Sequence, residues 1–131
     1  MENTKRLDLF YDALKDEYKS YVDDVVKSIG FLVVAIGWIM TSDGARAFLT
    51  NGQVNTVALA CTVVLGACNL VIYIGHYFRS ARLKQQILLL DSEASELVAN
   101  YAIRVVHIVV NSVTMGGFFV LLVLLISSLR R

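Results

Sequence analysis

The chain has 131 residues, a net charge of only +1, no proline, and 56% hydrophobic residues. Its mean hydropathy is +0.62, and 18% of its residues are charged, against roughly a quarter in soluble domains. This length limits the chain to one domain, and its mixed charges exclude the basic stripe of a nucleic-acid-binding protein. The motifs GxGxxG, GxxxxGK[ST], HExxH, CxxC and GxSxG are all absent, so we expect no enzyme.

The N-terminal segment, residues 4–24, is predicted to be an amphipathic helical arm. Its charged pattern lacks the short basic region followed by an apolar core that marks a cleavable signal peptide. Its apolar residues follow a 4-3 heptad spacing. They are Leu7, Tyr11, Leu14, Tyr18, Tyr21 and Val25. The polar face is acidic, which favours a packed arm over a helix lying on anionic lipid, although that second arrangement stays open.

Three stretches without Asp, Glu, Lys or Arg follow the arm, at residues 28–42, 47–78 and 105–129. Each is long and apolar enough to predict a transmembrane helix. We place the spans at residues 25–42, 54–78 and 105–129. The first two are joined by a short loop with Gly44, Asn51 and Gly52 as turn residues.

Positively charged residues predict the orientation of the spans in a plasma (inner) membrane. Nine lie on the side of the arm and of residues 79–104, and the opposite side holds Arg46, Arg130 and Arg131. The nine are Lys5, Arg6, Lys15, Lys19, Lys27, Arg79, Arg82, Lys84 and Arg104. We therefore expect the N-terminus and residues 79–104 in the cytoplasm and the C-terminus outside.

Residues 79–104 show the same heptad spacing as the arm. Its apolar positions are Leu83, Ile87, Leu90, Ala94, Leu97 and Tyr101. The segment is either one helix lying flat or a hairpin in which the second span continues to about Leu90 and a new helix starts near Ser92, with Asp91 or Ser92 as N-cap. The sequence thus predicts an all-α membrane protein with three transmembrane helices, whose cytoplasmic extensions form a small coiled-coil-like stalk.

Small and polar residues inside the spans predict close helix packing or self-association. They are Ala58, Thr62, Gly66 and Asn69 in the second span, and Ser112 and Gly116 in the third. The alternative is that the first group lines a pore. Cys61 and Cys68 are predicted to be small buried residues, because seven residues of helix separate them by about 10.5 Å, too far for a disulfide.

His76 and His107 are predicted to lie at similar depth on neighbouring helices. Two such histidines are weak candidates to ligate a haem or a metal, and they also suggest a pH-sensitive gate. No other cofactor is indicated.

Three functions remain open at this point. The first is a non-catalytic protein of the lipid bilayer that assembles with itself or with other membrane-protein subunits as an accessory subunit. The second is a homo-oligomeric pore, and the third is a haem-binding electron-transfer subunit using His76 and His107. No nucleic-acid partner is expected.

Overall fold

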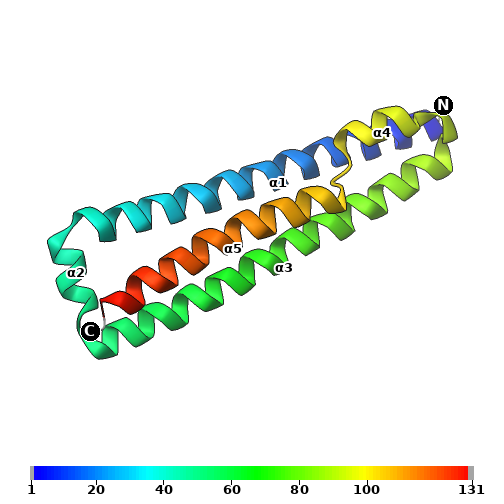
Figure 1. Cartoon of the computed structure of the whole chain (residues 1–131). Coiled ribbons are helices and arrows are strands. Elements are labelled where there is room, and N and C mark those ends of the chain that lie inside the picture. The colour runs from blue at the N-terminus through cyan, green and yellow to red at the C-terminus, as the bar shows by residue number, and fades with distance from the viewer. Residues whose placement is uncertain (1, 130–131) are drawn as a thin grey trace. The chain divides into compact units, whose positions relative to one another are not determined.

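The computed structural model describes residues 2–129, which form helices and no strand (Figure 1). The elements are α1 (Glu2–Thr41), α2 (Asp43–Leu49), α3 (Gly52–Leu90), the 3₁₀ helix η1 (Ser92–Ala94), α4 (Ser95–Tyr101) and α5 (Val105–Ser128). Helices α1, α3 and α5 each contain a segment long and apolar enough to cross a membrane. The prediction of an all-α chain with three such helices is confirmed.

The predicted arms are not separate elements from the first two spans. Helix α1 runs without a break through residues 4–24 and 25–41, and α3 runs from Gly52 past Phe78 to Leu90. Neither helix contains a proline, and the glycines within them lie at ordinary helical dihedral angles. The boundaries drawn at residues 24 and 78 therefore mark a change of composition rather than an end of a helix.

The loop predicted after the first span is mostly the helix α2. Ser42 is its N-cap, with an extended backbone and a hydroxyl that accepts a hydrogen bond from the Ala45 amide at 3.2 Å. Asp43 in the first turn forms an ion pair with Arg46. The turn itself is confined to residues 50–51, where the Asn51 side chain accepts from the amides of residues 53 and 54 and so caps α3.

The second connection confirms half of the predicted hairpin. Helix α3 ends at Leu90, and the Asp91 side chain accepts from the Glu93 amide at 3.0 Å as an N-cap. The return arm, however, is not continuous with the third span, because α4 ends at Tyr101 and α5 starts at Val105. The buried Ser80 hydroxyl accepts from the Ile103 amide at 2.9 Å, which satisfies one main-chain donor of this break.

The chain divides into two compact units: unit 1 is Met1–Asp24 with Ile72–Val109, and unit 2 is Val25–Val71 with Val110–Arg131. In unit 1 the arm, the end of α3 and the η1–α4 segment share one apolar core. Its buried members are Leu14, Ile87, Ala94, Val98 and Ala102, and Leu7, Phe10, Tyr11, Leu83 and Tyr101 pack against them. The arm, the end of α3 and the η1–α4 segment therefore bury apolar side chains against one another.

The residues of the predicted seam differ in burial within unit 1. Leu14, Tyr21 and Ile87 are buried, and Tyr18 packs edge-on against Tyr101 with ring centroids 6.3 Å apart. Leu90 is 38% exposed. After the 3₁₀ helix, Ala94 lies in the core and Tyr101 packs against it as the heptad spacing predicts, and Val98, which was not predicted, is also a core residue. The side chain of Leu97 lies outside the part that the structure describes.

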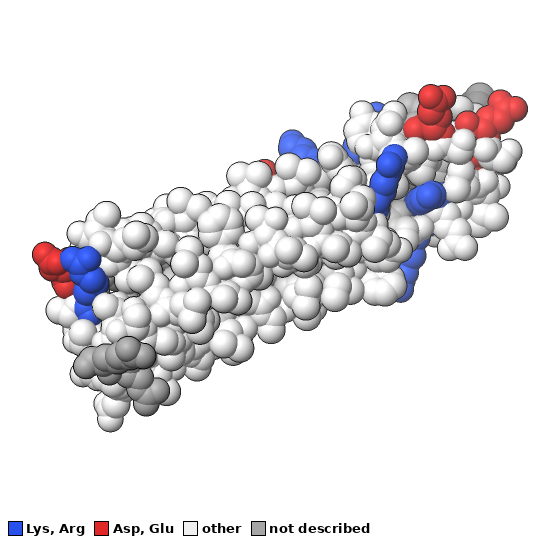
Figure 2. Space-filling view, viewed as in Figure 1, with Lys and Arg blue, Asp and Glu red and all other residues white. Residues whose placement is uncertain are grey.

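Unit 2 buries an apolar core that includes Leu32, Met115 and Leu122, together with two polar residues, and leaves many large apolar side chains exposed. On α3, Asn55 and Thr62 are buried, whereas large apolar side chains such as Val57, Val63 and Val71 are more than 60% exposed. Figure 2 shows a surface largely free of charge over the apolar helices, with charged atoms at α2. A helix that faces water has charged or polar side chains on its exposed face, so the exposed valines of α3 suit a lipid environment.

Candidate functional site

The most polar buried site of unit 1 is centred on His76, and we call His76 with Glu17, Asp24 and Arg79 the His76 clamp. The imidazole comes from α3, its side chain is 3% exposed, and both ring nitrogens meet carboxylates of α1. Nδ1 lies 2.7 Å from Glu17 Oε1, and Nε2 lies 2.9 Å from Asp24 Oδ2. Glu17 and Asp24 are seven residues apart, so they lie on the same side of α1 two turns apart.

The donor and acceptor roles of the two His76 contacts depend on the tautomer of the imidazole, because a ring nitrogen donates only where it carries a hydrogen. Arg79 Nε lies 3.3 Å from the same Oε1 of Glu17. The Tyr21 ring meets the imidazole edge-on, with centroids 5.8 Å apart, and shields it from solvent. The clamp therefore brings His76 and Arg79 of α3 together with two carboxylates of α1.

This arrangement does not suit the haem or metal site proposed for the two histidines. Both nitrogens of His76 are engaged by carboxylates, so neither presents a lone pair to iron. His107, on α5, is half-buried, and its Nδ1 accepts from the Arg104 amide at 3.4 Å. Within residues 2–129 no described contact joins the two imidazoles, and no cluster of three His, Cys, Asp or Glu side chains could hold a metal.

The polar stripe predicted on the second span is engaged in contacts inside unit 2. The Ser28 hydroxyl of α1 donates to Asn69 Oδ1 of α3 at 2.7 Å, and the Asn69 amide donates to the Leu65 carbonyl. The Thr62 hydroxyl donates to the Ala58 carbonyl. Ala58 is a half-buried residue. A methyl group added at Gly66 would meet the Phe119 ring of α5 at 3.5 Å, so this glycine admits close packing of α5.

Ser112 and Gly116, the two small residues singled out on the third span, lie in different environments. The Ser112 hydroxyl is buried and has no hydrogen-bond partner among the described residues. Gly116 is exposed, and no atom lies within 4 Å of the position that a methyl group would occupy there. Cys61 and Cys68 are free thiols and both are exposed, so their predicted burial is wrong.

Sequence reasoning missed Asn55, the most completely buried polar residue of unit 2. Its side-chain amide donates to the Leu49 carbonyl at 3.1 Å and to the Ile126 carbonyl at 2.7 Å. These carbonyls belong to the last turns of α2 and α5, whose final four carbonyls have no partner within the helix. The 4-3 spacing of the stripe, extended backwards from Thr62 through Ala58, reaches Asn55 and could have identified it.

Together, these sites consist of charge pairs, helix caps and small-residue contacts that join helices. No protein-family model, curated protein or solved structure matches the chain.

Proposed function

We propose that the chain is a non-catalytic multi-pass membrane protein that assembles with copies of itself through the exposed face of α5. Membrane insertion is supported by the three long apolar helices and by the many valine side chains that unit 2 leaves exposed, such as Val57, Val63 and Val71. A bilayer supplies the apolar surroundings that these exposed side chains require.

The observation that carries the assembly proposal is the open glycine surface of α5. Gly116 and Gly117 are exposed, and nothing lies within 4 Å of a methyl group added at either position. Val113 and Val120 flank them and are 70% and 59% exposed. Apolar area does not drive helix association in lipid, but small residues let two backbones approach closely enough to gain packing contacts. A second copy of α5 would find such a surface here.

The pore remains a prediction that liposome conductance would test, but its sequence argument is weakened. The residues that motivated it are Thr62, Gly66 and Asn69, and their hydrogen bonds and packing contacts are made within unit 2. The same surface of α5 would also serve an accessory subunit that binds a different membrane protein, which the experiment below separates from self-assembly.

The proposal retains the orientation expected from the charges, with the arm and residues 79–104 in the cytoplasm of a cell bounded by a plasma (inner) membrane. It places the α2 connection outside. A cysteine introduced as Asp43→Cys, with Cys61 and Cys68 replaced by serine, should then react with a membrane-impermeant maleimide added to intact cells. Labelling only after lysis would reverse the orientation.

The assembly experiment compares Gly116→Ile with Gly30→Ile. Both glycines are exposed in unit 2 with no atom within 4 Å of an added Cβ, so the two substitutions start from matched, open positions. Native mass spectrometry after release from lipid nanodiscs should show a discrete oligomer for wild type and for Gly30→Ile, and a monomer for Gly116→Ile. A monomeric wild type would overturn self-assembly and favour the accessory-subunit alternative.

A further inference from the structure

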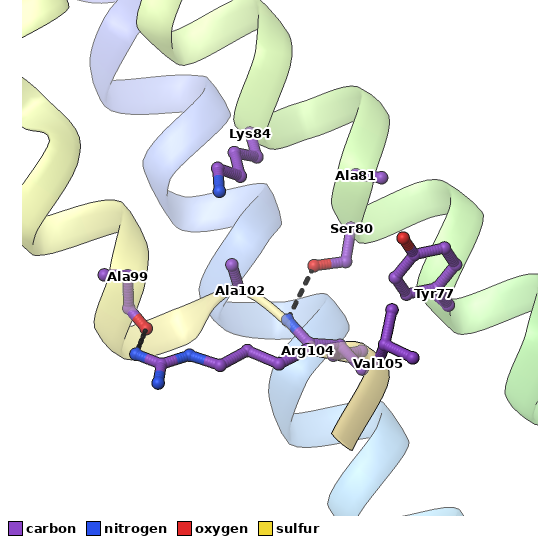
Figure 3. A pocket seen from close by; sticks show the side chains of 9 residues that line it. Tyr77, Ser80, Ala81, Lys84, Ala99, Ala102, Arg104 and Val105 are labelled. Atoms are coloured by element: carbon purple, nitrogen blue, oxygen red, sulfur yellow. Dashed lines mark hydrogen bonds between the residues drawn. The ribbon is translucent and has the colours of Figure 1, made fainter. Parts of the chain in front are cut away.

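A pocket of about 430 Å³ opens in unit 1 between the end of α3 and the break that separates α4 from α5. Figure 3 shows two cationic residues in its lining, Lys84 from α3 and Arg104 from the connection. The other lining residues are apolar or neutral, and no carboxylate is among them. The pocket therefore has two positive charges that its own walls do not compensate.

Neither cation is neutralised elsewhere in the described part of the chain. Arg104 donates one hydrogen bond from Nη2 to the Ala99 carbonyl at 3.1 Å, which fixes the guanidinium at the pocket wall without neutralising it. No described residue forms an ion pair with Arg104 or Lys84. A guanidinium has five N–H donors and an ammonium has three, so most of their hydrogen-bonding capacity is available to a ligand.

The pocket lies where the sequence changes from apolar to basic on both helices. On α3, Tyr77 and Phe78 precede Arg79, and on α5 the apolar run starts at Val105, directly after Arg104. Tyr77 and Val105 line the pocket itself. The neighbouring side chains of Phe78, Val106 and Val109 are all more than half exposed, so an apolar surface adjoins the cationic pocket.

We propose that this pocket binds the phosphate group of one anionic phospholipid, with Lys84 and Arg104 holding the headgroup and the acyl chains lying along the exposed apolar side chains. The charge sign selects an anion, and the adjoining apolar surface selects a lipid over a small soluble phosphate. Basic pockets at the cytoplasmic ends of membrane helices recognise anionic headgroups in this way. The inference rests on the proposed insertion of α3 and α5 into a bilayer but not on self-assembly.

The experiment measures lipid retention by native mass spectrometry of the full chain in detergent, with added phosphatidylglycerol or phosphatidylcholine. Wild type should retain phosphatidylglycerol about tenfold more strongly than phosphatidylcholine. Lys84→Gln with Arg104→Gln should remove most of that preference. The matched control is Lys19→Gln with Arg82→Gln, which removes the same charge from two exposed residues outside the pocket and should keep the preference.

Three results would overturn the proposal: equal retention of the two lipids by wild type, an unchanged preference in the pocket variant, or an equal loss in the control variant. Strong retention of glycerol 3-phosphate would assign the pocket to a soluble phosphate and overturn the lipid assignment. Because the same spectrum reports subunit number, a monomer that retains phosphatidylglycerol would separate failure of self-assembly from failure of this pocket. Flotation of the protein with liposomes tests insertion independently.

Discussion

Replacing His76 by alanine should destabilise the chain by about 3 kcal/mol, because the imidazole joins two carboxylates of α1 from a site that is 3% exposed. A hydrogen bond to a charged group contributes about 1.5–3 kcal/mol. The bond to Glu17 should be worth about 2 kcal/mol, since this carboxylate is 13% exposed but keeps Arg79 as a partner. The bond to Asp24 should contribute about 1 kcal/mol, because that side chain is 41% exposed and water replaces the lost donor.

The same reasoning predicts which variants of the His76 clamp lose the most stability. Glu17→Gln should cost more than Asp24→Asn, because the glutamate is the more buried of the two acceptors. Glu17→Gln and His76→Ala together should cost about 1–2 kcal/mol less than the sum of the single changes, because both remove one shared contact. His107→Ala is the control and should stay within about 0.5 kcal/mol of wild type, since its one hydrogen bond is long.

The assay is equilibrium unfolding in mixed detergent micelles, followed by far-ultraviolet circular dichroism, which reports loss of helix. Two results would refute the energetic account of the clamp. One is a His76→Ala variant no less stable than His107→Ala. The other is an Asp24→Asn variant that loses more stability than Glu17→Gln, because burial would then not decide the strength of the two contacts.

Three further predictions use the same assay. Ile87→Ala should cost about 3 kcal/mol because Ile87 is fully buried, whereas Leu90→Ala, at a 38% exposed position, should cost less than about 1 kcal/mol. Asn55→Ala should cost about 2 kcal/mol by leaving two buried carbonyls without their donor. Partial burial and the Asp91 carboxylate raise the pKa of Tyr11. The free energy of unfolding should therefore decrease as the pH rises above 10, and Tyr11→Phe should reduce that decrease.

The three long apolar helices were predictable because charge-free stretches of this length have few alternatives. The continuity of the first span with the N-terminal arm was not, because the boundary at residue 24 followed composition, whereas α1 continues through it. The continuation of the second span to Leu90 was predicted only as one of two alternatives for residues 79–104. The α2 helix was missed although Ser42 and Asp43 form an ordinary N-terminal capping signal. The glycine at position 44 suggested a turn, but α2 contains it without strain.

The site was harder to predict than the helices. His76 could be identified from sequence, but its partners could not, because Glu17 and Asp24 lie 59 and 52 residues away in the chain. The seven-residue spacing of Glu17 and Asp24 places them on one face of α1 but gives no information about which residue of α3 they oppose. Val98 was missed for a related reason, since heptad spacing along residues 83–101 did not show that this residue would enter the core shared with Leu14 and Ile87.

The contacts of Asn55 and Gly66 have a consequence for the order in which the chain assembles during synthesis. The Ser28–Asn69 hydrogen bond and the contacts of His76 with Glu17 and Asp24 need only α1 and α3, so they can form before α5 leaves the ribosome. The second hydrogen bond of Asn55, and the ring that covers Gly66, are supplied by α5. The first two long helices can therefore pair before the third is made, and the third helix supplies the second acceptor of Asn55.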